Sequence, residues 1–213
     1  MPARLLTLPL GPLQANCYLL LEDEAPAAVA IDPGGEAARV LAALRQQQKQ
    51  LTHILLTHAH FDHLGAVADL VETTGASLAL HAGDLPLLRR RGGARDWGFN
   101  VRPCPEPTLL IEPGQMLEAG PVRLEALFVP GHTPGHLAYY WPQAQAVFTG
   151  DVLFKEGVGR TDLPGGDYDT LMRSIHAVLL TLPEETVVYP GHGPATTIGD
   201  EKRSNPFLAR PPA

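Results

Sequence analysis

The sequence has few cysteines, no long apolar run and no excess of positive charge. Its two cysteines, Cys17 and Cys104, do not form a CxxC pair, which excludes a zinc ribbon or a dithiol redox motif. A disulfide between them would be unusual in a chain without a secretory signal, and the N-terminus lacks the apolar segment of a signal peptide. No apolar run approaches membrane-spanning length. We therefore expect a cytoplasmic protein with no membrane partner.

Charge and length limit the possible functions further. The 16 basic residues are outnumbered by 23 acidic residues, so the formal net charge is −7. This balance argues against a general nucleic-acid-binding surface, and we expect no nucleic-acid partner. A local basic run, Arg89-Arg90-Arg91, is interpreted as a solvated helix end rather than a binding patch. No linker divides the chain, so we expect one domain over residues 1–213, with an oligomeric state that the sequence does not specify.

Metal-binding residue types are most dense in the segment Thr57-His58-Ala59-His60-Phe61-Asp62-His63. An apolar run precedes this segment and an apolar-periodic run follows it, which predicts a strand, a loop and then a helix. In the extended part, alternate side chains His58, His60 and Asp62 can project to one side, and His63 falls in the first helical turn. Clustered buried histidines need many hydrogen-bond partners, whereas neutral imidazole and carboxylate are preferred ligands of divalent metals.

Three more strand-like segments each end just before a residue of the same kind. Residues 122–129 precede His132, residues 146–148 precede Asp151, and residues 186–189 precede His192. Neighbouring glycines permit sharp turns and close approach of the backbone. The candidate metal ligands are thus His58, His60, Asp62, His63, His132, Asp151 and His192. Seven ligands exceed the four of a structural zinc site and suit two metals that share Asp151 and a nucleophilic hydroxide.

Several other polar residues have a structural and a functional interpretation. Asp32 precedes Pro-Gly, so we favour a turn residue over a carboxylate near the metals. For His136, support of the metal ligands or a structural hydrogen bond is favoured over ligation. His53 has apolar neighbours and is interpreted as a hydrogen-bonded core histidine, while His81 and His176 stand alone as ordinary histidines.

The rest of the chain alternates between strand and helix patterns. Strands are expected near residues 4–8, 17–22, 27–31 and 77–80, and helices over 36–48, 63–73, 84–91 and 168–180. Residues 92–107 have an irregular pattern and are expected to form either a lid or a surface loop.

The ligand motif, together with Gly131-His132, Gly150-Asp151 and Gly191-His192, resembles the signature of the metallo-β-lactamase superfamily from about Leu5 to Pro194. This resemblance implies an α/β fold, a four-layer αββα sandwich with metals at one edge between two sheets. It also implies that His58, His60 and His132 hold one metal, that Asp62, His63 and His192 hold the other, and that Asp151 bridges them. The two divalent ions are expected to be zinc, with iron or manganese as alternatives.

Within that superfamily, the complete THxHxDH motif and the bridging Asp are most similar to the glyoxalase II group, which hydrolyses thioesters of glutathione. Two features differ: the chain lacks that group's C-terminal helical domain, and Gly-x-Gly-Lys-Phe-Tyr is replaced by Gly157-Val158-Gly159-Arg160-Thr161-Asp162. Compact bacterial glyoxalase II-like proteins share this short form. The resemblance therefore implies a binuclear hydrolase of a small-molecule thioester such as S-lactoylglutathione.

On this reading, Asp62 and Asp151 are the catalytic residues. Arg160 either pairs with a substrate carboxylate or forms a surface salt bridge. An alternative follows from persulfide dioxygenases, which have the same fold and also resemble the chain at residues 159–162. They hold one iron with two histidines and an aspartate, here His58, His132 and Asp151. A non-enzymatic zinc module fits poorly, because the ligand count leaves vacant positions for substrate.

Overall fold

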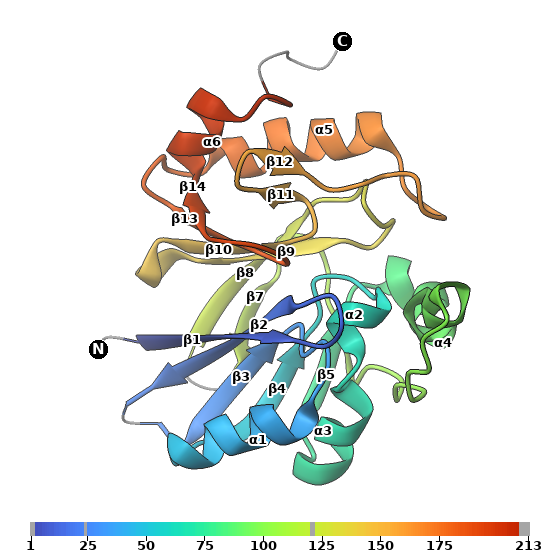
Figure 1. Cartoon of the computed structure of the whole chain (residues 1–213). Helices are drawn as coiled ribbons and strands as arrows, with labels where there is room; N and C mark the ends of the chain where they lie inside the picture. Colours follow the sequence, from blue (N-terminus) through green and yellow to red (C-terminus); the bar gives the residue numbers. More distant parts are fainter. Residues whose placement is uncertain (1–2, 24, 120–121, 209–213) are drawn as a thin grey trace.

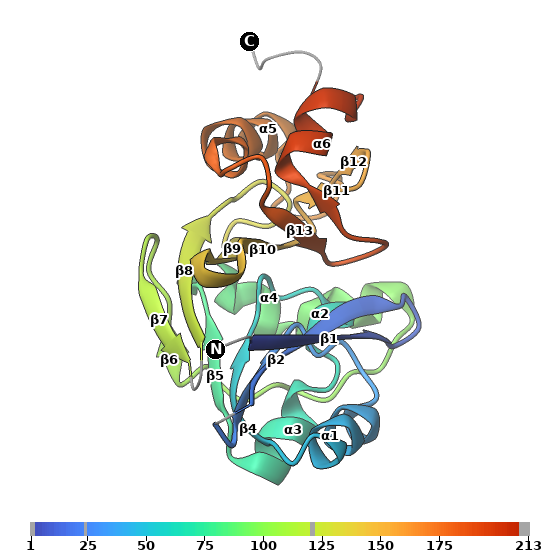
Figure 2. The same ribbon diagram turned by 90° about the vertical axis from the view of Figure 1, so that its left-hand side faces the viewer.

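The computed structural model describes residues 3–23, 25–119 and 122–208, so both ends of the domain expected over residues 1–213 lie outside it. The described residues form two six-stranded sheets that stack face to face, with helices on both outer sides (Figures 1 and 2). The αββα sandwich is therefore confirmed. No helix in this part of the chain is long and apolar enough to cross a membrane.

The first sheet is built from the N-terminal half of the chain. Its spatial order is β1 (Ala3–Leu10), β2 (Ala15–Glu22), β3 (Ala27–Ile31), β4 (Gln50–Leu55), β5 (Ser77–Leu80) and β6 (Leu109–Leu110). From β3 to β6 the neighbours are parallel, so crossover helices connect them. These are α1 (Ala37–Gln46), then α2 (Phe61–Leu64) and α3 (Val67–Thr74), and finally η1 (Ala82–Asp84), α4 (Leu85–Arg89) and η2 (Arg91–Trp97). The strands β3, β4 and β5 consequently end at the same edge.

The second sheet is built from the C-terminal half. Its order is β14 (Thr196–Thr197), β13 (Val187–Pro190), β10 (Ala146–Gly150), β9 (Leu137–Trp141), β8 (Val122–Phe128) and β7 (Met116–Ala119). Both β8 and β10 are antiparallel to β9, and β13 is parallel to β10, so β8, β10 and β13 end at one edge. On the outer side lie α5 (Tyr168–Ala177), η4 (Leu179–Thr181), α6 (Ile198–Ser204) and the hairpin of β11 (Leu153–Phe154) and β12 (Gly157–Val158), whereas η3 (Pro142–Ala144) links β9 to β10 (Figure 1).

Successive side chains of the central strands enter different apolar layers. In β2, Tyr18 and Leu20 lie in the layer between the sheets, whereas Leu19 and Leu21 pack in the layer beneath α1 and α3. The same alternation in β10 places Val147 beneath α5. Strands buried on both faces are continuous apolar runs, which explains why the sequence predicts these central strands well.

Element boundaries and several short elements differ from the sequence prediction. The helix expected over 63–73 is interrupted, because the Ala66 N–H donates to Pro33 O (2.9 Å) instead of continuing the helical pattern. The helix expected over 168–180 ends at Ala177 and is followed by η4, and the helix expected over 84–91 begins one residue later and ends at Arg89. The strands β7 and β9 and the helix α6 were not predicted. Residues 92–107, expected to be irregular, begin with a left-handed kink at Gly92 and Gly93, which lies within η2, and the 3-10 helix then continues to Trp97.

Candidate metal centre

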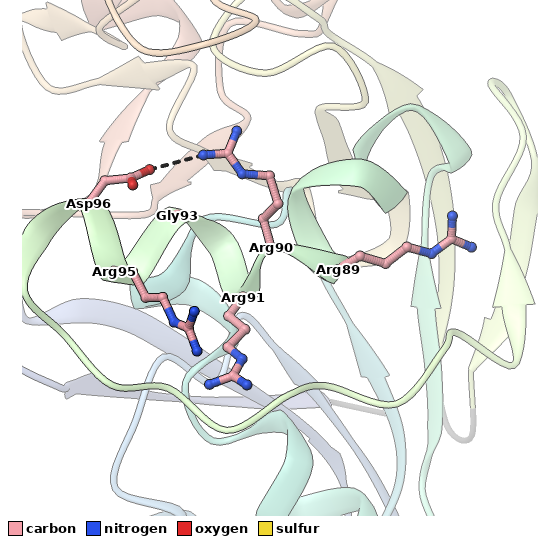
Figure 3. Close-up of a pocket in the computed structure, with 6 residues that line it drawn as sticks. All are labelled: Arg89, Arg90, Arg91, Gly93, Arg95 and Asp96. Carbon is pink, nitrogen blue, oxygen red and sulfur yellow. Dashed lines mark hydrogen bonds and ion pairs between the residues drawn. The ribbon is translucent and has the colours of Figure 1, made fainter.

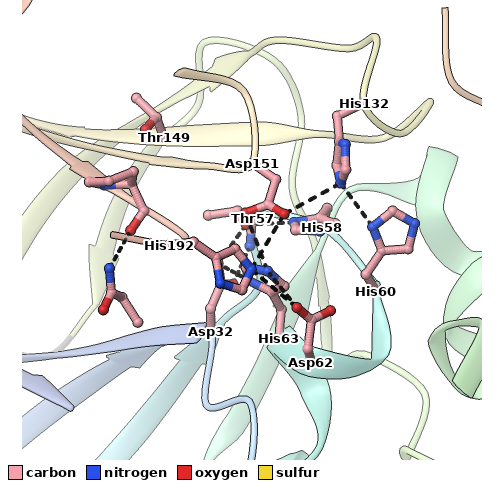
Figure 4. A network of polar contacts seen from close by, with 12 residues as sticks. Asp32, Thr57, His58, His60, Asp62, His63, His132, Thr149, Asp151 and His192 are labelled. Atoms are coloured by element: carbon pink, nitrogen blue, oxygen red, sulfur yellow. Dashed lines mark hydrogen bonds and ion pairs between the residues drawn. The ribbon is translucent and has the colours of Figure 1, made fainter. Parts of the chain in front are cut away.

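Polar side chains from both sheets converge at the edge where β3, β4, β8, β10 and β13 end (Figure 4). The loop after β4 and the short helix α2 carry four of the predicted ligands, and the loops after β8, β10 and β13 carry one each. Two backbone hydrogen bonds join the sheets here: Leu137 N–H to Thr57 O (2.8 Å) and Asn16 N–H to Gly191 O (2.7 Å). A Cβ on Gly191 would lie 2.1 Å from Asp151 Oδ1, so glycine is required for this close approach.

The predicted ligand atoms form two groups around one carboxylate. The first group is His58, His60 and His132, the second is Asp62, His63 and His192, and the ligand atoms within each lie no more than 4.8 Å apart. Asp151 stands between the groups: its Oδ2 lies 3.7 Å from His132 Nε2 and 3.6 Å from His192 Nε2, and its Oδ1 lies 3.4 Å from His63 Nε2. This grouping is the one the resemblance implies, although metal ligation by each residue stays a prediction.

Hydrogen bonds at the outer nitrogens fix the orientation of three imidazoles. His132 Nδ1 donates to the backbone carbonyl of Arg160 (2.7 Å), and His63 Nδ1 donates to Asp32 Oδ2 (3.0 Å). The Thr57 hydroxyl donates to Asp32 Oδ2 (2.6 Å), so it accepts from His58 Nδ1 (3.0 Å). Each Nδ1 therefore carries a proton. The Nε2 atoms of His58 and His132 present a lone pair towards the centre of the site, and His63 Nε2 does so only after it loses the second proton that its raised pKa favours.

Several of these inward-facing atoms lack a hydrogen bond within the described residues. His58 Nε2, His63 Nε2 and Asp151 Oδ1 are buried and make no hydrogen bond. A buried unpaired polar atom costs about 1–3 kcal/mol, which applies to His58 Nε2, whereas His63 Nε2 and Asp151 Oδ1 face each other at 3.4 Å. A divalent cation accepts lone pairs from neutral imidazole and carboxylate, which are the groups present here. The residues thus fit a metal centre and could hold two ions.

Burial and neighbouring charges set the protonation of the metal-free centre. Burial, reinforced by His132 and His63, lowers the pKa of His60 to about 3. Burial also lowers the pKa of His58 and of the neighbouring His136 well below 6.5. For His63, burial is outweighed by Asp151 and Asp62, which hold its pKa well above 6.5. Of the predicted ligands, His58 and His60 are therefore kept in the neutral form that ligates metals, whereas His63 and His192, whose pKa values are raised, would lose a proton when a metal binds.

The turn interpretation favoured for Asp32 is incomplete, because this carboxylate belongs to the site. Asp32 is 2% exposed and accepts hydrogen bonds from the Thr57 N–H (2.8 Å), the Thr57 hydroxyl and His63 Nδ1. Its φ of 50° places it in a turn as expected. The turn follows β3, however, and its N–H donates to Leu55 O (3.1 Å) of the parallel neighbour β4. This pairing brings the carboxylate against the metal-binding loop.

Asp84 is a buried member of the site region that the sequence did not reveal. Its Oδ2 accepts from the Ala59 N–H (2.9 Å) and the Thr133 hydroxyl (2.8 Å), and its Oδ1 accepts from the Gly135 N–H (2.7 Å). Burial raises the pKa of Asp84, although these three donors oppose the shift. One carboxylate thus ties the loop of His58 to the loop of His132. In sequence, the only signal was an acidic residue near a predicted helix start.

The histidines outside the two groups lie partly as expected. His136 Nε2 accepts from the Asp151 N–H (3.2 Å) and its ring stacks on His58 with centroids 4.7 Å apart, which confirms a supporting hydrogen bond. His53 is only half-buried and contacts the neighbouring Thr52 hydroxyl (2.9 Å), so its expected core position is wrong in part. The isolated His81 accepts locally from the Gly83 N–H (3.1 Å).

A cavity of about 400 Å³ gives access to the centre. Its polar lining is His60, Asp62, His132, Asp151, His192 and Arg160, and its apolar lining is Leu13, Phe61, Trp97, Phe154 and Leu163. Arg160 makes a two-bond ion pair with Asp162 (2.7 and 2.7 Å), and its guanidinium carbon lies 5.5 Å from the Trp97 ring centroid. The salt bridge expected as one alternative is therefore present, and the same side chain also lines the cavity.

The fold and the histidine- and aspartate-lined edge define a metal-binding αββα protein, and comparison with known proteins gives its family. The family model described as "Metallo-beta-lactamase superfamily" matches residues 10–192. The chain belongs to the metallo-β-lactamase superfamily.

Two curated relatives match nearly the whole chain. "Probable metallo-hydrolase YqgX" of Bacillus subtilis is 43% identical over 204 residues, which covers 94% of this chain and 95% of that protein. "Hydroxyacylglutathione hydrolase GloC" of Haemophilus influenzae is 40% identical over 208 residues, with 94% and 96% covered. The chain is thus grouped with metallo-hydrolases.

Solved structures agree on the fold but differ in what they describe. BLEG-1 B3 metallo-beta-lactamase is similar with a TM-score of 0.92 and 40% identity, covering 97% of this chain and 100% of that one. TTHA1623 in a di-iron-bound form is similar with a TM-score of 0.88 and 46% identity, covering 95% of this chain and 100% of that one. ETHE1 from Myxococcus xanthus is similar with a TM-score of 0.80 and 32% identity, covering 98% of this chain and 85% of that one. The three structures share the fold, and the names of two of them, a metallo-beta-lactamase and a di-iron-bound form, indicate a metal.

Proposed function

We propose that this protein hydrolyses thioesters with two bound divalent metal ions, and that a hydroxyacylglutathione such as S-lactoylglutathione is a substrate. The observation that supports this most strongly is the pair of three-residue groups on either side of Asp151, with buried ligand-type atoms that make no hydrogen bond. A 40% identical relative named hydroxyacylglutathione hydrolase supports the thioester.

Each of the two groups of residues would hold one metal ion. His58, His60 and His132 would hold one ion, Asp62, His63 and His192 the other, and Asp151 both. When bound, the ions supply a hydroxide at neutral pH and an electrophile for the substrate carbonyl. The Asp62 carboxylate lines the cavity and can accept a hydrogen bond from the attacking water, which orients it towards the acyl carbon. A thiolate leaves readily, so no strong general acid is needed.

The cavity wall suits a substrate with an apolar portion and a negative charge. Leu13, Trp97 and Phe154 offer apolar contact beside the centre. Asp162 accepts from Nε and Nη2 of Arg160, which leaves the N–H groups of Nη1 for a substrate carboxylate. In this role Arg160 positions the substrate while its ion pair with Asp162 stays intact.

The test combines elemental analysis of the purified protein with a lactoylglutathione hydrolysis assay. We expect about two transition-metal ions per chain and activity that chelation removes and zinc, manganese or iron restores. Hydrolysis of a β-lactam is the comparison reaction, because one structural relative is a B3 metallo-beta-lactamase. A protein with two metals that cleaves the lactam and no thioester would contradict the proposal.

Mononuclear iron chemistry is the second candidate, because residues 159–162 resemble persulfide dioxygenases. A 46% identical protein was solved with iron bound, although in a di-iron form. On this alternative the protein is a persulfide dioxygenase with one iron on His58, His132 and Asp151. A one-iron site would not use Asp62, His63 and His192 as ligands, although their ligand atoms lie within 4.8 Å of one another, and this favours two metals. Oxygen consumption with glutathione persulfide, together with one iron per chain, would favour the dioxygenase.

A further inference from the structure

A second cavity, of about 330 Å³, has a lining dominated by arginine (Figure 3). It is formed by Arg89, Arg90, Arg91, Gly93, Arg95 and Asp96, which come from the end of α4 and from η2. In a chain with a net charge of −7, four of the 16 basic residues line this one cavity. The solvated helix end expected from the sequence is present, because Arg89 ends α4 and is exposed. The same run also lines this cavity, which we call the arginine cavity.

Two of the four arginines have acidic partners and two do not. Arg89 pairs with Glu106 (2.9 Å) and Arg90 with Asp96 (3.2 Å). Among the described residues, none makes an ion pair or side-chain hydrogen bond with Arg91 or Arg95, whose side chains extend to the same side of η2 in Figure 3. Two positive charges remain available, so the cavity suits a ligand with one or two negative charges.

The arginine cavity is built directly onto the metal-binding loop. Arg91 and Gly92 both have positive φ angles, 58° and 65°. This left-handed turn brings Gly92 so close to the start of α2 that a Cβ would lie 2.2 Å from Phe61 N. The backbone of Arg91 and Gly92 is therefore fixed relative to His60 and Asp62, which flank Phe61.

A small third cavity, of about 40 Å³, lies between the arginine cavity and the 400 Å³ cavity at the metal centre, which we call the catalytic cavity. It shares His60, Trp97 and Leu163 with the catalytic cavity. It shares Arg90, Gly93 and Asp96 with the arginine cavity. The small cavity thus shares wall residues with each of the other two: Trp97 lines it and the catalytic cavity, and Arg90 lines it and the arginine cavity.

We propose that the arginine cavity binds the negatively charged end of the thiol carrier while the thioester lies at the metal centre. This inference rests on the proposed function and adds the class of carrier: a thiol that bears carboxylates or phosphates away from its sulfur. Guanidinium groups bind both anions in the same two-bond geometry. A carrier that reaches Arg91 and Arg95 gains charge pairing, whereas an uncharged carrier gains only the contacts around Trp97.

The kinetic test compares three thioesters with one acyl group on different carriers: glutathione with its carboxylates, coenzyme A with its phosphates, and uncharged N-acetylcysteamine. In the double variant Arg91→Gln/Arg95→Gln, we expect kcat/KM to fall about tenfold for the thioester of one charged carrier, because its KM rises. For the thioester of the uncharged carrier, kcat/KM should stay unchanged. The matched control is Arg123→Gln, an exposed arginine on β8 of the other sheet. Equal effects on charged and uncharged carriers, or no effect on any, would overturn the inference.

A binding measurement separates this inference from the proposed function. The metal-loaded protein is titrated calorimetrically with S-methylglutathione and with S-methyl-coenzyme A, neither of which can be hydrolysed. We expect one of them to bind the wild type and to lose about tenfold in affinity in the double variant but not in Arg123→Gln. If neither binds, the arginine cavity is not a carrier site, even if thioesters are hydrolysed. If binding depends on the arginines but no thioester is cleaved, the proposed function fails and the carrier site stands.

Discussion

Asp32 Oδ2 lies 3.0 Å from Nδ1 of His63, and the same carboxylate also accepts two hydrogen bonds from Thr57. The contact joins the end of β3 to the first turn of α2. This hydrogen bond keeps a proton on the outer nitrogen, Nδ1, of His63. It also orients the ring so that Nε2 faces Asp151, 3.4 Å away. Groups that hold a ligand imidazole in this way commonly change metal affinity by 10–100-fold when removed.

The substitution Asp32→Asn tests this relationship. The amide presents a donor where the carboxylate accepts from donors, so His63 loses its orientation. We expect the second ion to bind about 10–100-fold more weakly, leaving about one ion per chain after dialysis. The measurement is metal content against dialysis with a weak chelator. Asp69→Asn, an exposed carboxylate on α3, is the matched control and should keep two ions. Two tightly held ions in Asp32→Asn would show that the contact is dispensable.

Asp84 supports a prediction about folding rather than metal affinity. Replacing it by Ala leaves the Ala59 and Gly135 N–H groups and the Thr133 hydroxyl buried without their acceptor. At about 1–3 kcal/mol for each unpaired group, the free energy of unfolding should fall by at least about 3 kcal/mol. Thr133→Val removes only one of these bonds and should cost about 1 kcal/mol. Urea unfolding of the metal-free proteins measures both. Equal stabilities of the two variants would contradict a tie through Asp84.

Local sequence signals predicted the strands and the metal-binding loop because those signals depend on neighbouring residues. The run Ile54-Leu55-Leu56 before Thr57-His58 indicates a buried strand that ends in polar ligands, and β4 does end at Leu55. The helix α3 likewise follows from apolar periodicity. The residue at which α3 starts does not follow from periodicity, because the Ala66 N–H donates to the carbonyl of Pro33, 33 residues earlier in the chain.

What the sequence missed depends on contacts between distant segments. Asp32 looks like a turn residue until β3 and β4 pair in parallel and bring its carboxylate to Thr57 and His63. Asp84 contacts Ala59 and Gly135, 25 and 51 residues away. No periodicity encodes such contacts, and both carboxylates lie beside the centre rather than in its motif. The role of Trp97 in the cavity wall is invisible in sequence for the same reason.

The protonation of the metal-free centre predicts its pH dependence. The pKa values of His58, His60 and His136 are lowered by burial, so these groups stay neutral in the folded protein while the unfolded chain gains protons below about pH 6.5. The free energy of unfolding should therefore fall on acidification from pH 6.5 to 5, by up to about 1.4 kcal/mol per pH unit for each histidine. His63, with its raised pKa, contributes stability below pH 6.5 that is lost as the pH rises through that raised value.

Urea unfolding of the chelated protein at pH 7.5, 6.5 and 5.5 measures this slope. His60→Gln removes one of the three contributing groups, so its slope should be smaller by about one proton per molecule. A stability that stays flat between pH 6.5 and 5.5 would mean that these imidazoles are not held neutral.

Asp151 supports the prediction with the largest expected effect. Its carboxylate lies between the two groups, and burial, which would raise its pKa, is outweighed by His63 and His132, so the pKa is lowered and the group is charged. Asp151→Asn removes that charge from the position that faces both proposed ions, and His58→Ala removes a ligand of one. We expect kcat/KM for the thioester to fall at least about 1,000-fold in each, equivalent to about 4 kcal/mol, with the far-ultraviolet circular dichroism of the fold retained.

Asp200→Asn, an exposed carboxylate on α6, is the control for charge alone and should keep full activity. Metal analysis of the same samples connects activity to ligation. Because Asp151 is proposed to hold both ions, its variant should lose both, whereas His58→Ala should lose mainly one. Full hydrolysis by metal-depleted His58→Ala would show that the reaction does not use this centre, and the two-metal proposal would then fail regardless of how well the side chains converge.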